Sequence, residues 1–152
     1  MKLPEEVIDF FHKQNFTIVS TIDKFGQPHN SCKGLVEIKP SGKVYLLDLY
    51  LGQTHANLKH NQHVALTAVD EHRFRGYSLK GAAKIVNRDK LGQAVIKAWE
   101  KRIANRVTQR VLKNMSGDKG HHTHPEALLP QPAYLIAMEV KEIVDLTPHH
   151  LK

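Results

Sequence analysis

The pattern of apolar and polar residues changes period along the chain, and each change marks a predicted element. Residues 4–14 place apolar side chains at helical spacing behind Pro4, which suits a first helical turn, so a short helix is expected there. Apolar residues at steps of three and four predict a long helix over residues 89–113. Runs rich in β-branched residues predict strands over residues 16–22, 29–38, 44–50, 63–70, 77–87 and 134–140.

The connections between these elements determine the predicted architecture. The turns at 23–28 and 39–43 are too short for a parallel crossover, so the first strands are expected to form an antiparallel meander. Helices at the start, in the middle and before the last strand then give a mainly β fold, a six-stranded antiparallel split β-barrel with peripheral helices. The length of 152 residues suits one domain, 1–152, with helix 89–113 and loop 114–131 inserted before the last strand.

Composition excludes several classes of protein. Apolar residues make up 41% and charged residues 24%, which is typical of a globular domain and not of a fibrous or disordered chain. No apolar run approaches the roughly 18 residues of a membrane span, and residues 1–6 lack the apolar core of a signal peptide. Cys32 is the one cysteine, so no internal disulfide can form. A reducing, cytoplasmic location without membrane contact is expected.

Charge is distributed unevenly along the chain. The 22 Lys and Arg residues exceed the 15 Asp and Glu residues, for a formal net charge of +7, and residues 84–119 carry the whole excess. The bases of helix 89–113 are expected on an outward face, opposite Trp99, Ile103 and Val107. Solvation explains such a face best and steering of an anionic partner second. Nucleic-acid binding explains it least well, because no aromatic residue accompanies the bases for stacking.

The segment from 44 to 64 contains the clearest candidate chemistry. A buried strand is followed by Gly52, and Thr54 is expected to cap a short helix. A helix N-terminus presents unpaired N–H groups and partial positive charge, so it can bind a phosphate, with the Thr54 hydroxyl and the Gln53 amide as further donors. From these residues alone the simpler interpretation is that Thr54 only caps its own helix and Asn57 braces the loop.

Several short motifs follow one another at defined separations over residues 16–86. No single motif is specific, but in this order the chain resembles the pyridoxamine 5′-phosphate oxidase-like family of FMN-binding split barrels. The segment Thr54-His55-Ala56-Asn57 is also similar to that of small bacterial FMN-binding proteins. The motifs are Ile18-Val19-Ser20-Thr21-Ile22, Gly26-Gln27-Pro28-His29, Val44-Tyr45-Leu46-Leu47, Thr54-x-x-Asn57-Leu58, Asn61-x-x-Val64-Ala65-Leu66 and Leu79-x-Gly81-x-Ala83-x-Ile85-Val86.

The resemblance implies FMN as cofactor and a homodimer with the flavin at its interface. It places the phosphate at Gln53 and Thr54, the flavin ring along the second strand and the ribityl chain beside the third. Gly34 would let the backbone approach the ring, and Lys33 is the candidate contact for the polar edge of the ring at N1 and O2. The implied cofactor-binding residues are Ser31, Cys32, Lys33, Gly34, Leu47, Asp48, Leu49, Gln53, Thr54 and Asn57.

One departure from the family pattern concerns the phosphate. Many members have Lys or Arg immediately before the threonine, where this chain has Gln53, so one ion pair is missing. FMN could bind more weakly, a base from elsewhere could compensate, or the ligand could have been lost. The candidate bases are Lys33, Arg73 and Lys80.

Cysteine and histidine each allow a second interpretation. Cys32 could lie against the flavin as a thiol, but a small buried residue on a strand is the favoured interpretation. His121, His122 and His124 form a dense cluster that could bind zinc, copper or nickel. No metal site is assigned, because no carboxylate or cysteine completes an evident ligand set. No catalytic residue is assigned.

These patterns support one leading hypothesis for function and two alternatives. The leading hypothesis is an FMN-binding protein that acts as a flavin-dependent oxidoreductase or electron carrier and supplies binding and shielding for the flavin. A complete vitamin B6 oxidase is not expected, because no basic segment is evident to hold a second phosphorylated substrate. The alternatives are a non-catalytic module that binds flavin, deazaflavin or haem, and a nucleic-acid-binding accessory protein that uses the basic helix.

Overall fold

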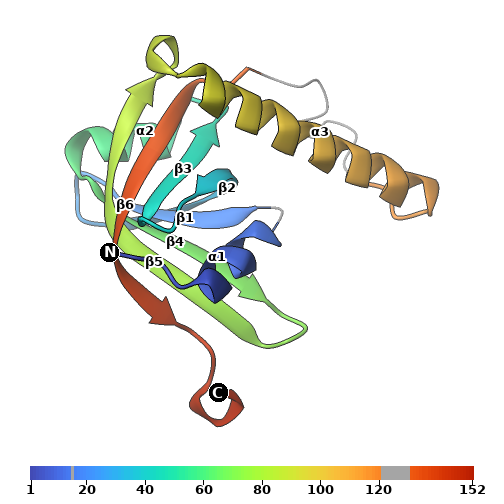
Figure 1. Ribbon diagram of the computed structural model, residues 1–152. Coiled ribbons are helices and arrows are strands. Elements are labelled where there is room, and N and C mark those ends of the chain that lie inside the picture. Colours follow the sequence, from blue (N-terminus) through green and yellow to red (C-terminus); the bar gives the residue numbers. More distant parts are fainter. Residues whose placement is uncertain (15, 121–130) are drawn as a thin grey trace.

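Six strands close into a barrel in the computed structural model, which describes residues 1–14, 16–120 and 131–152 (Figure 1). Their order around the barrel is β1-β2-β3-β6-β5-β4, and every neighbouring pair is antiparallel. The predicted six-stranded antiparallel barrel is confirmed. The strands are β1 Thr17–Ile22, β2 Pro28–Ile38, β3 Lys43–Asp48, β4 His63–Asp70, β5 Arg75–Asn87 and β6 Tyr134–Asp145.

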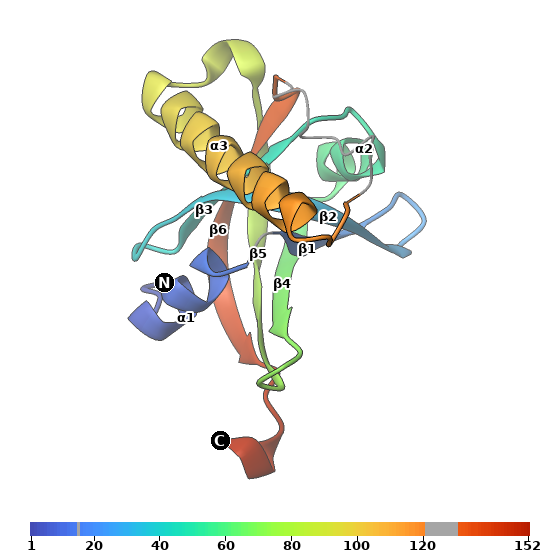
Figure 2. The same cartoon turned by 90° about the vertical axis from the view of Figure 1, so that its right-hand side faces the viewer.

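In the described part of the chain, three α-helices lie outside the barrel: α1 Glu5–His12, α2 Gln53–His60 and α3 Gln93–Met115. Figure 2 shows α1 and α2 on opposite sides of the barrel and α3 crossing it. The long helix begins four residues later than predicted. A short 3-10 turn, Arg88–Lys90, comes first, and Gly92 has the extended backbone of a helix cap. Within the described residues, no helix has the length and apolar composition to cross a membrane.

The strand period of two divides the apolar residues into two clusters. Inward-facing residues of all six strands fill the barrel together with Val7 and Phe11 of α1. A second cluster lies outside the barrel, where Trp99 and Ile103 of α3 cover Leu47 of β3. Strand β3 is therefore apolar on both faces because one face meets the barrel interior and the other meets α3, as its sequence predicted.

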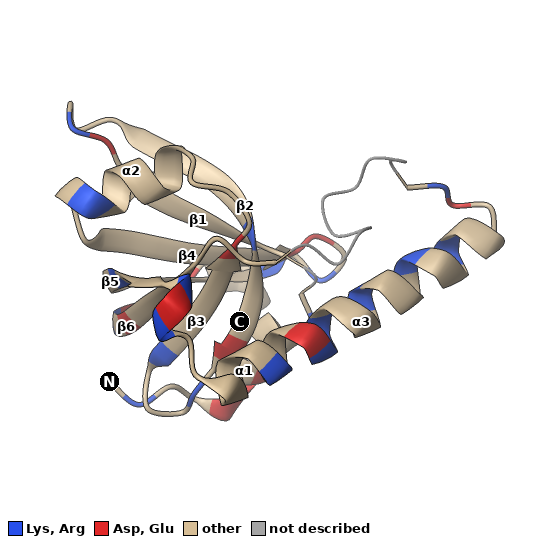
Figure 3. Cartoon of the chain, turned by 90° about the horizontal axis from the view of Figure 1, so that it is seen from above, with Lys and Arg blue, Asp and Glu red and all other residues tan. Residues whose placement is uncertain are grey.

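The basic residues of α3 do not share one outward face. Figure 3 shows Lys and Arg recurring along a helix that continues beyond the barrel. Lys97 and Lys101 point to solvent as expected, but Arg106 is buried and Arg102 and Arg110 are half-buried. The predicted outward placement of the arginines is wrong. Arg102, Arg106 and Arg110 recur every four residues, on the same side as Trp99, because a long aliphatic stem can cover apolar surface.

Candidate functional site

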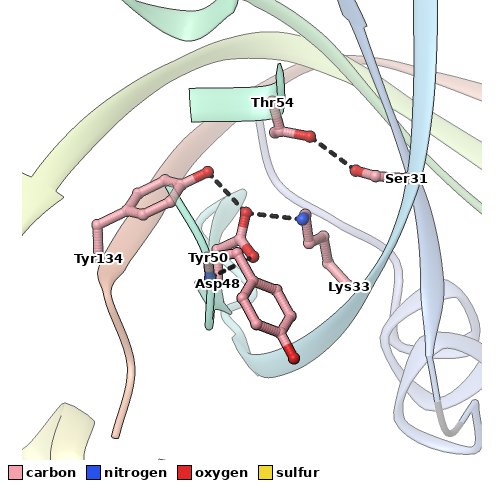
Figure 4. Close-up of polar contacts among 6 residues, drawn as sticks. All are labelled: Ser31, Lys33, Asp48, Tyr50, Thr54 and Tyr134. Carbon is pink, nitrogen blue, oxygen red and sulfur yellow. Dashed lines mark hydrogen bonds and ion pairs between the residues drawn. The ribbon is translucent and has the colours of Figure 1, made fainter. Parts of the chain in front are cut away.

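The end of the barrel interior next to α2 is polar instead of apolar (Figure 4). Ser31 and Lys33 alternate on β2 with residues of the other face, and so they continue the inward row that Leu35 begins. Asp48 ends β3, and Tyr134 begins β6 directly opposite it in the strand register. The first turn of α2 adds Thr54, so four separate elements bring their polar side chains to one place.

Asp48 is the buried charge of this cluster, with only 3% of its surface exposed. One carboxylate oxygen accepts hydrogen bonds from Lys33 Nζ at 2.7 Å and from the Tyr134 hydroxyl at 2.8 Å. The other oxygen accepts the backbone N–H of Tyr50 at 3.3 Å. A buried carboxylate is tolerated only when it is paired and hydrogen-bonded, and these three donors meet that requirement.

The surroundings of the cluster shift the pKa values of Tyr134 and His55. Burial, then the hydrogen bond to Asp48 and the charge of that carboxylate, raise the pKa of Tyr134 far above its ordinary value of 10.0. The His55 ring lies against the Tyr134 ring, with 4.7 Å between centroids, and burial followed by the charge of Lys59 lowers the pKa of His55. The phenol therefore stays protonated as a donor, and the imidazole is biased towards its neutral form.

Thr54 does not cap α2, which corrects the prediction. The capping residue is Gly52, whose carbonyl oxygen accepts the first helical hydrogen bond from the N–H of Ala56 at 3.1 Å. Thr54 lies inside the first turn, and its hydroxyl shares a hydrogen bond of 2.8 Å with the Ser31 hydroxyl. The side chain is therefore directed at β2 and not at its own helix.

Asn57 fixes α2 to the barrel, which agrees with the bracing role expected for it. Its amide nitrogen donates to the Thr21 hydroxyl on β1 at 3.0 Å, and its amide oxygen accepts from Gln53 Nε2 at 2.6 Å. Asn57 is buried and Gln53 is exposed. Gln53 thus occupies the position of the missing base with its amide turned along the helix.

The ten predicted cofactor residues divide between the two faces of the sheet. Leu47 is buried under α3 and Leu49 is half-buried beside it, so both belong to the outer cluster. Cys32 is exposed on that outer face, which contradicts the predicted buried position. The structure brings together Ser31, Lys33, Asp48, Gln53, Thr54 and Asn57 near α2, and it places Cys32, Gly34, Leu47 and Leu49 on the outer face.

Gly34 is covered by a side chain of the basic helix. The guanidinium nitrogens of Arg106 lie 2.7 and 2.8 Å from the position that a Cβ atom at residue 34 would occupy. The same guanidinium lies 5.8 Å from the Trp99 ring centroid, within the range of a cation–π contact. The close approach that Gly34 permits is thus made by Arg106, a residue that the sequence placed in solvent.

The three candidate replacements for the missing base occupy different places. Lys33 lies in the cluster and pairs with Asp48. Arg73 forms a long ion pair with Asp70. It follows β4, and α2 precedes this strand, so the length of eight strand residues, about 25 Å, separates Arg73 from α2. Lys80 lies on β5, where it pairs with Glu142 at 3.1 Å. Lys33 is the one of the three that reaches the cluster.

Some residues of the site could not be identified from the sequence, and one predicted histidine cluster cannot be compared with the structure. Tyr134, His55 and Arg106 carried no local signal; only the pairing of β3 with β6 identifies Tyr134 as the partner of Asp48. His121, His122 and His124 lie outside the described residues. Elsewhere, the described parts of the chain contain no group of three or more His, Cys, Asp or Glu residues arranged to hold a metal ion.

Comparison with known proteins identifies the family to which the chain is similar. A family model described as pyridoxamine 5′-phosphate oxidase matches residues 3–129. No curated protein matches the chain at a significant level.

Solved structures share the fold at low sequence identity. HupZ from Group A Streptococcus has a TM-score of 0.64 and 21% identity, over 95% of this chain and 94% of that chain. An F420 reductase has a TM-score of 0.60 and 16% identity, over 93% and 98%. HutZ, a haem storage protein from Vibrio cholerae, has a TM-score of 0.56 and 16% identity, over 95% and 94%.

The contact between Gly34 and Arg106 predicts a coupled effect of two substitutions. Gly34→Ala should lower the free energy of unfolding by about 1 kcal/mol, because the new methyl group pushes the end of the Arg106 side chain away from its place over the Trp99 ring. With Arg106→Ala already present, the same change should cost less than about 0.5 kcal/mol. Urea denaturation of the four proteins measures this coupling, and Gly120→Ala is the control because its added Cβ would approach only Asn114 Oδ1, at 4.0 Å. Additive effects would contradict the contact.

The raised pKa of Tyr134 predicts a loss of stability at alkaline pH. Above about pH 10 the phenol ionises in the unfolded chain but stays protonated in the folded protein, so rising pH stabilises the unfolded state relative to the folded one. The free energy of unfolding should therefore fall by about 1.4 kcal/mol more per pH unit in the native protein than in Tyr134→Phe. Urea denaturation at several pH values measures the slopes. Tyr50→Phe, at an exposed tyrosine, should keep the native slope, and equal slopes for all three proteins would refute the prediction.

Proposed function

The chain belongs to the pyridoxamine 5′-phosphate oxidase-like family, and from this premise we propose that it is an FMN-binding protein that acts as a flavin-dependent oxidoreductase or electron carrier. The observation that carries the proposal is the pair of hydroxyl groups of Ser31 and Thr54, 2.8 Å apart at the first turn of α2 and two residues along β2 from Lys33. Hydroxyl groups, helix N–H groups and a lysine together match the donors that a phosphorylated ring compound needs.

The phosphate would be held by neutral donors at the start of α2. Thr54 is almost completely buried and has no capping role, so its hydroxyl is positioned by the fold for a partner on the β2 side. The first N–H groups of a helix lack partners in their own helix and attract anions. Gln53 adds an amide and no charge, so we expect weaker phosphate binding than in family members with a base at this position.

Lys33 would contact the polar edge of the flavin ring. Its ammonium group can donate three hydrogen bonds, and the bond to Asp48 uses one of them. Asp48, which also accepts the Tyr134 hydroxyl, holds the ammonium at the end of the barrel, so a ligand would meet a fixed donor. FMN, when bound, supplies the hydride and electron transfer, while these side chains bind it, orient it and set the charge around it.

We also propose a homodimer and a cytoplasmic location. Phe16, just before β1, and Ile18, which pairs with Cys32 of β2, are both exposed, which offers apolar surface to a second copy near the site. The division of the predicted residues between two faces supports a site that a partner chain completes. An exposed free cysteine suits a reducing compartment.

The missing base beside Thr54 favours one alternative, a binding module for a ligand without a phosphate anchor. Haem is such a ligand, and a haem storage protein shares this fold. A deazaflavin module is the related alternative, because an F420 reductase also shares the fold. In either case Lys33 and Tyr134 would still line the polar end of the barrel.

The absorption spectrum of the untreated purified protein separates these functions. We expect the visible bands of bound flavin, with FMN released on denaturation and consumption of a reduced nicotinamide as a further test of turnover. A Soret band would identify the haem alternative. A colourless protein that does not bind added FMN would refute the proposal.

Substitutions at Thr54 test the phosphate site directly. Thr54→Val should weaken FMN binding by about tenfold to a hundredfold, because a hydrogen bond to a charged group contributes about 1.5–3 kcal/mol. Thr54→Ser keeps the hydroxyl and is the matched control, with affinity within about threefold of the native protein. Fluorescence titration with FMN measures both, and circular dichroism checks the fold. Native affinity in Thr54→Val would place the phosphate elsewhere.

A further inference from the structure

A cavity of about 410 Å³ lies on the outer side of the barrel across β1, β4 and β5. It does not include the Ser31–Thr54 pair, and only Thr21 is shared with the contacts of α2. This volume falls in the range of small-molecule sites. Its lining includes Ile22, Pro28, Ala65, Lys80, Ala82 and Lys141.

Small residues form the floor of this cavity. Ala65 and Ala82 face outward on neighbouring strands, with Gly81 between them, and Ile22 and Pro28 form an apolar wall. Any side chain at residue 81 would overlap the carbonyl oxygen of Glu139, so the backbone of β6 requires glycine there. A floor of small residues beside an apolar wall leaves apolar surface on which an aromatic ring can pack.

A bulge in β6 directs a cation to the rim. The register shifts between Lys80 and Gly81, which pair with Glu142 and Val140, so Lys141 is an extra residue in β6. Because of this shift, Lys141 and Glu142 both line the cavity although they are adjacent in the strand. Lys141 has no carboxylate partner in the described part of the chain.

The charges at the rim favour an anion. Lys80 and Lys141 are opposed by Glu142, while His63 adds a polar ring. The Lys80–Glu142 ion pair is about half exposed on both sides, and such pairs are weak enough to exchange for a ligand. We propose that this cavity binds a small aromatic acid, with the ring on Ala65 and Ala82 and the acidic group between Lys80 and Lys141. This site is separate from the proposed flavin site and does not depend on it.

The dye 8-anilinonaphthalene-1-sulfonate is a suitable probe, because it joins an aromatic system to an anion and fluoresces in apolar surroundings. N-phenyl-1-naphthylamine lacks the sulfonate and reports the apolar part alone. We expect saturable binding of the anionic dye to the protein as purified. Lys80→Gln and Lys141→Gln should each weaken it about two- to fivefold, and the double variant about tenfold, with little change for the neutral dye.

Two further variants keep the test specific. Lys84→Gln removes an exposed lysine from the same face of β5 outside the cavity and should leave both dyes unaffected. Ala65→Phe fills the floor and should abolish binding of both. Absence of saturable binding, as would follow if a second copy covered the cavity, would overturn the proposal, and so would equal affinity in the native protein and the double lysine variant.

Competition distinguishes this site from the proposed flavin site. We expect added FMN to leave the dye bound, because Ser31 and Thr54 lie outside the cavity. Displacement of the dye by FMN would overturn the claim of a separate site and would move the flavin to this face. Failure of FMN to bind at all would refute the proposed function but leave the dye results to decide this proposal alone.

Discussion

The buried carboxylate of Asp48 is the constraint on which the candidate site depends. An unpaired charge at this depth would cost several kcal/mol, so β2 must supply Lys33 and β6 must supply Tyr134. Since β3 lies between these strands, the requirement ties three strands together at the same end of the barrel. Helix α2 starts five residues after Asp48 and packs there, with His55 against Tyr134 and Thr54 against Ser31. The polar site is therefore a consequence of satisfying one buried charge.

The strand period of two explains why consecutive residues of β2 have different roles. Ser31 and Lys33 reach the barrel end, whereas Cys32 and Gly34 face outward, where Arg106 of α3 covers Gly34. The family resemblance predicted that all four of these residues contact one ligand. A single ligand could contact both faces only where β2 reaches its edge or where another chain contributes. This geometry is the physical reason for proposing a site that a second copy completes.

The sequence predicted the barrel well because its information on strands is local. Alternation, β-branched residues and short turns predicted six strands in an antiparallel barrel, and the spacing of Trp99 and Ile103 located α3. Predictions that required long-range contacts were wrong or absent. Threonine and glycine are both common N-cap residues, so residue type alone does not distinguish Thr54 from Gly52. Tyr134 meets Asp48 only through strand pairing, which no local pattern reveals. The spacing of the bases along the helix predicted an outward face for Arg106, but a long aliphatic stem lets an arginine cover apolar surface instead.

The placement of Arg106 bears on the charge that Gln53 lacks. Gly34 is three residues along β2 from Ser31, so strand rise alone separates their backbone positions by about 10 Å, and the guanidinium and the hydroxyl pair lie on opposite faces of the sheet. At that distance in a water-like medium one charge contributes about 0.4 kcal/mol to the binding of an anion, against about 1 kcal/mol at 4 Å. The arginines on the inner side of α3 can thus raise the local concentration of an anionic ligand, but they cannot replace a base in contact with its phosphate. Specific phosphate binding must then come from the hydroxyl groups of Ser31 and Thr54 and from the backbone of α2.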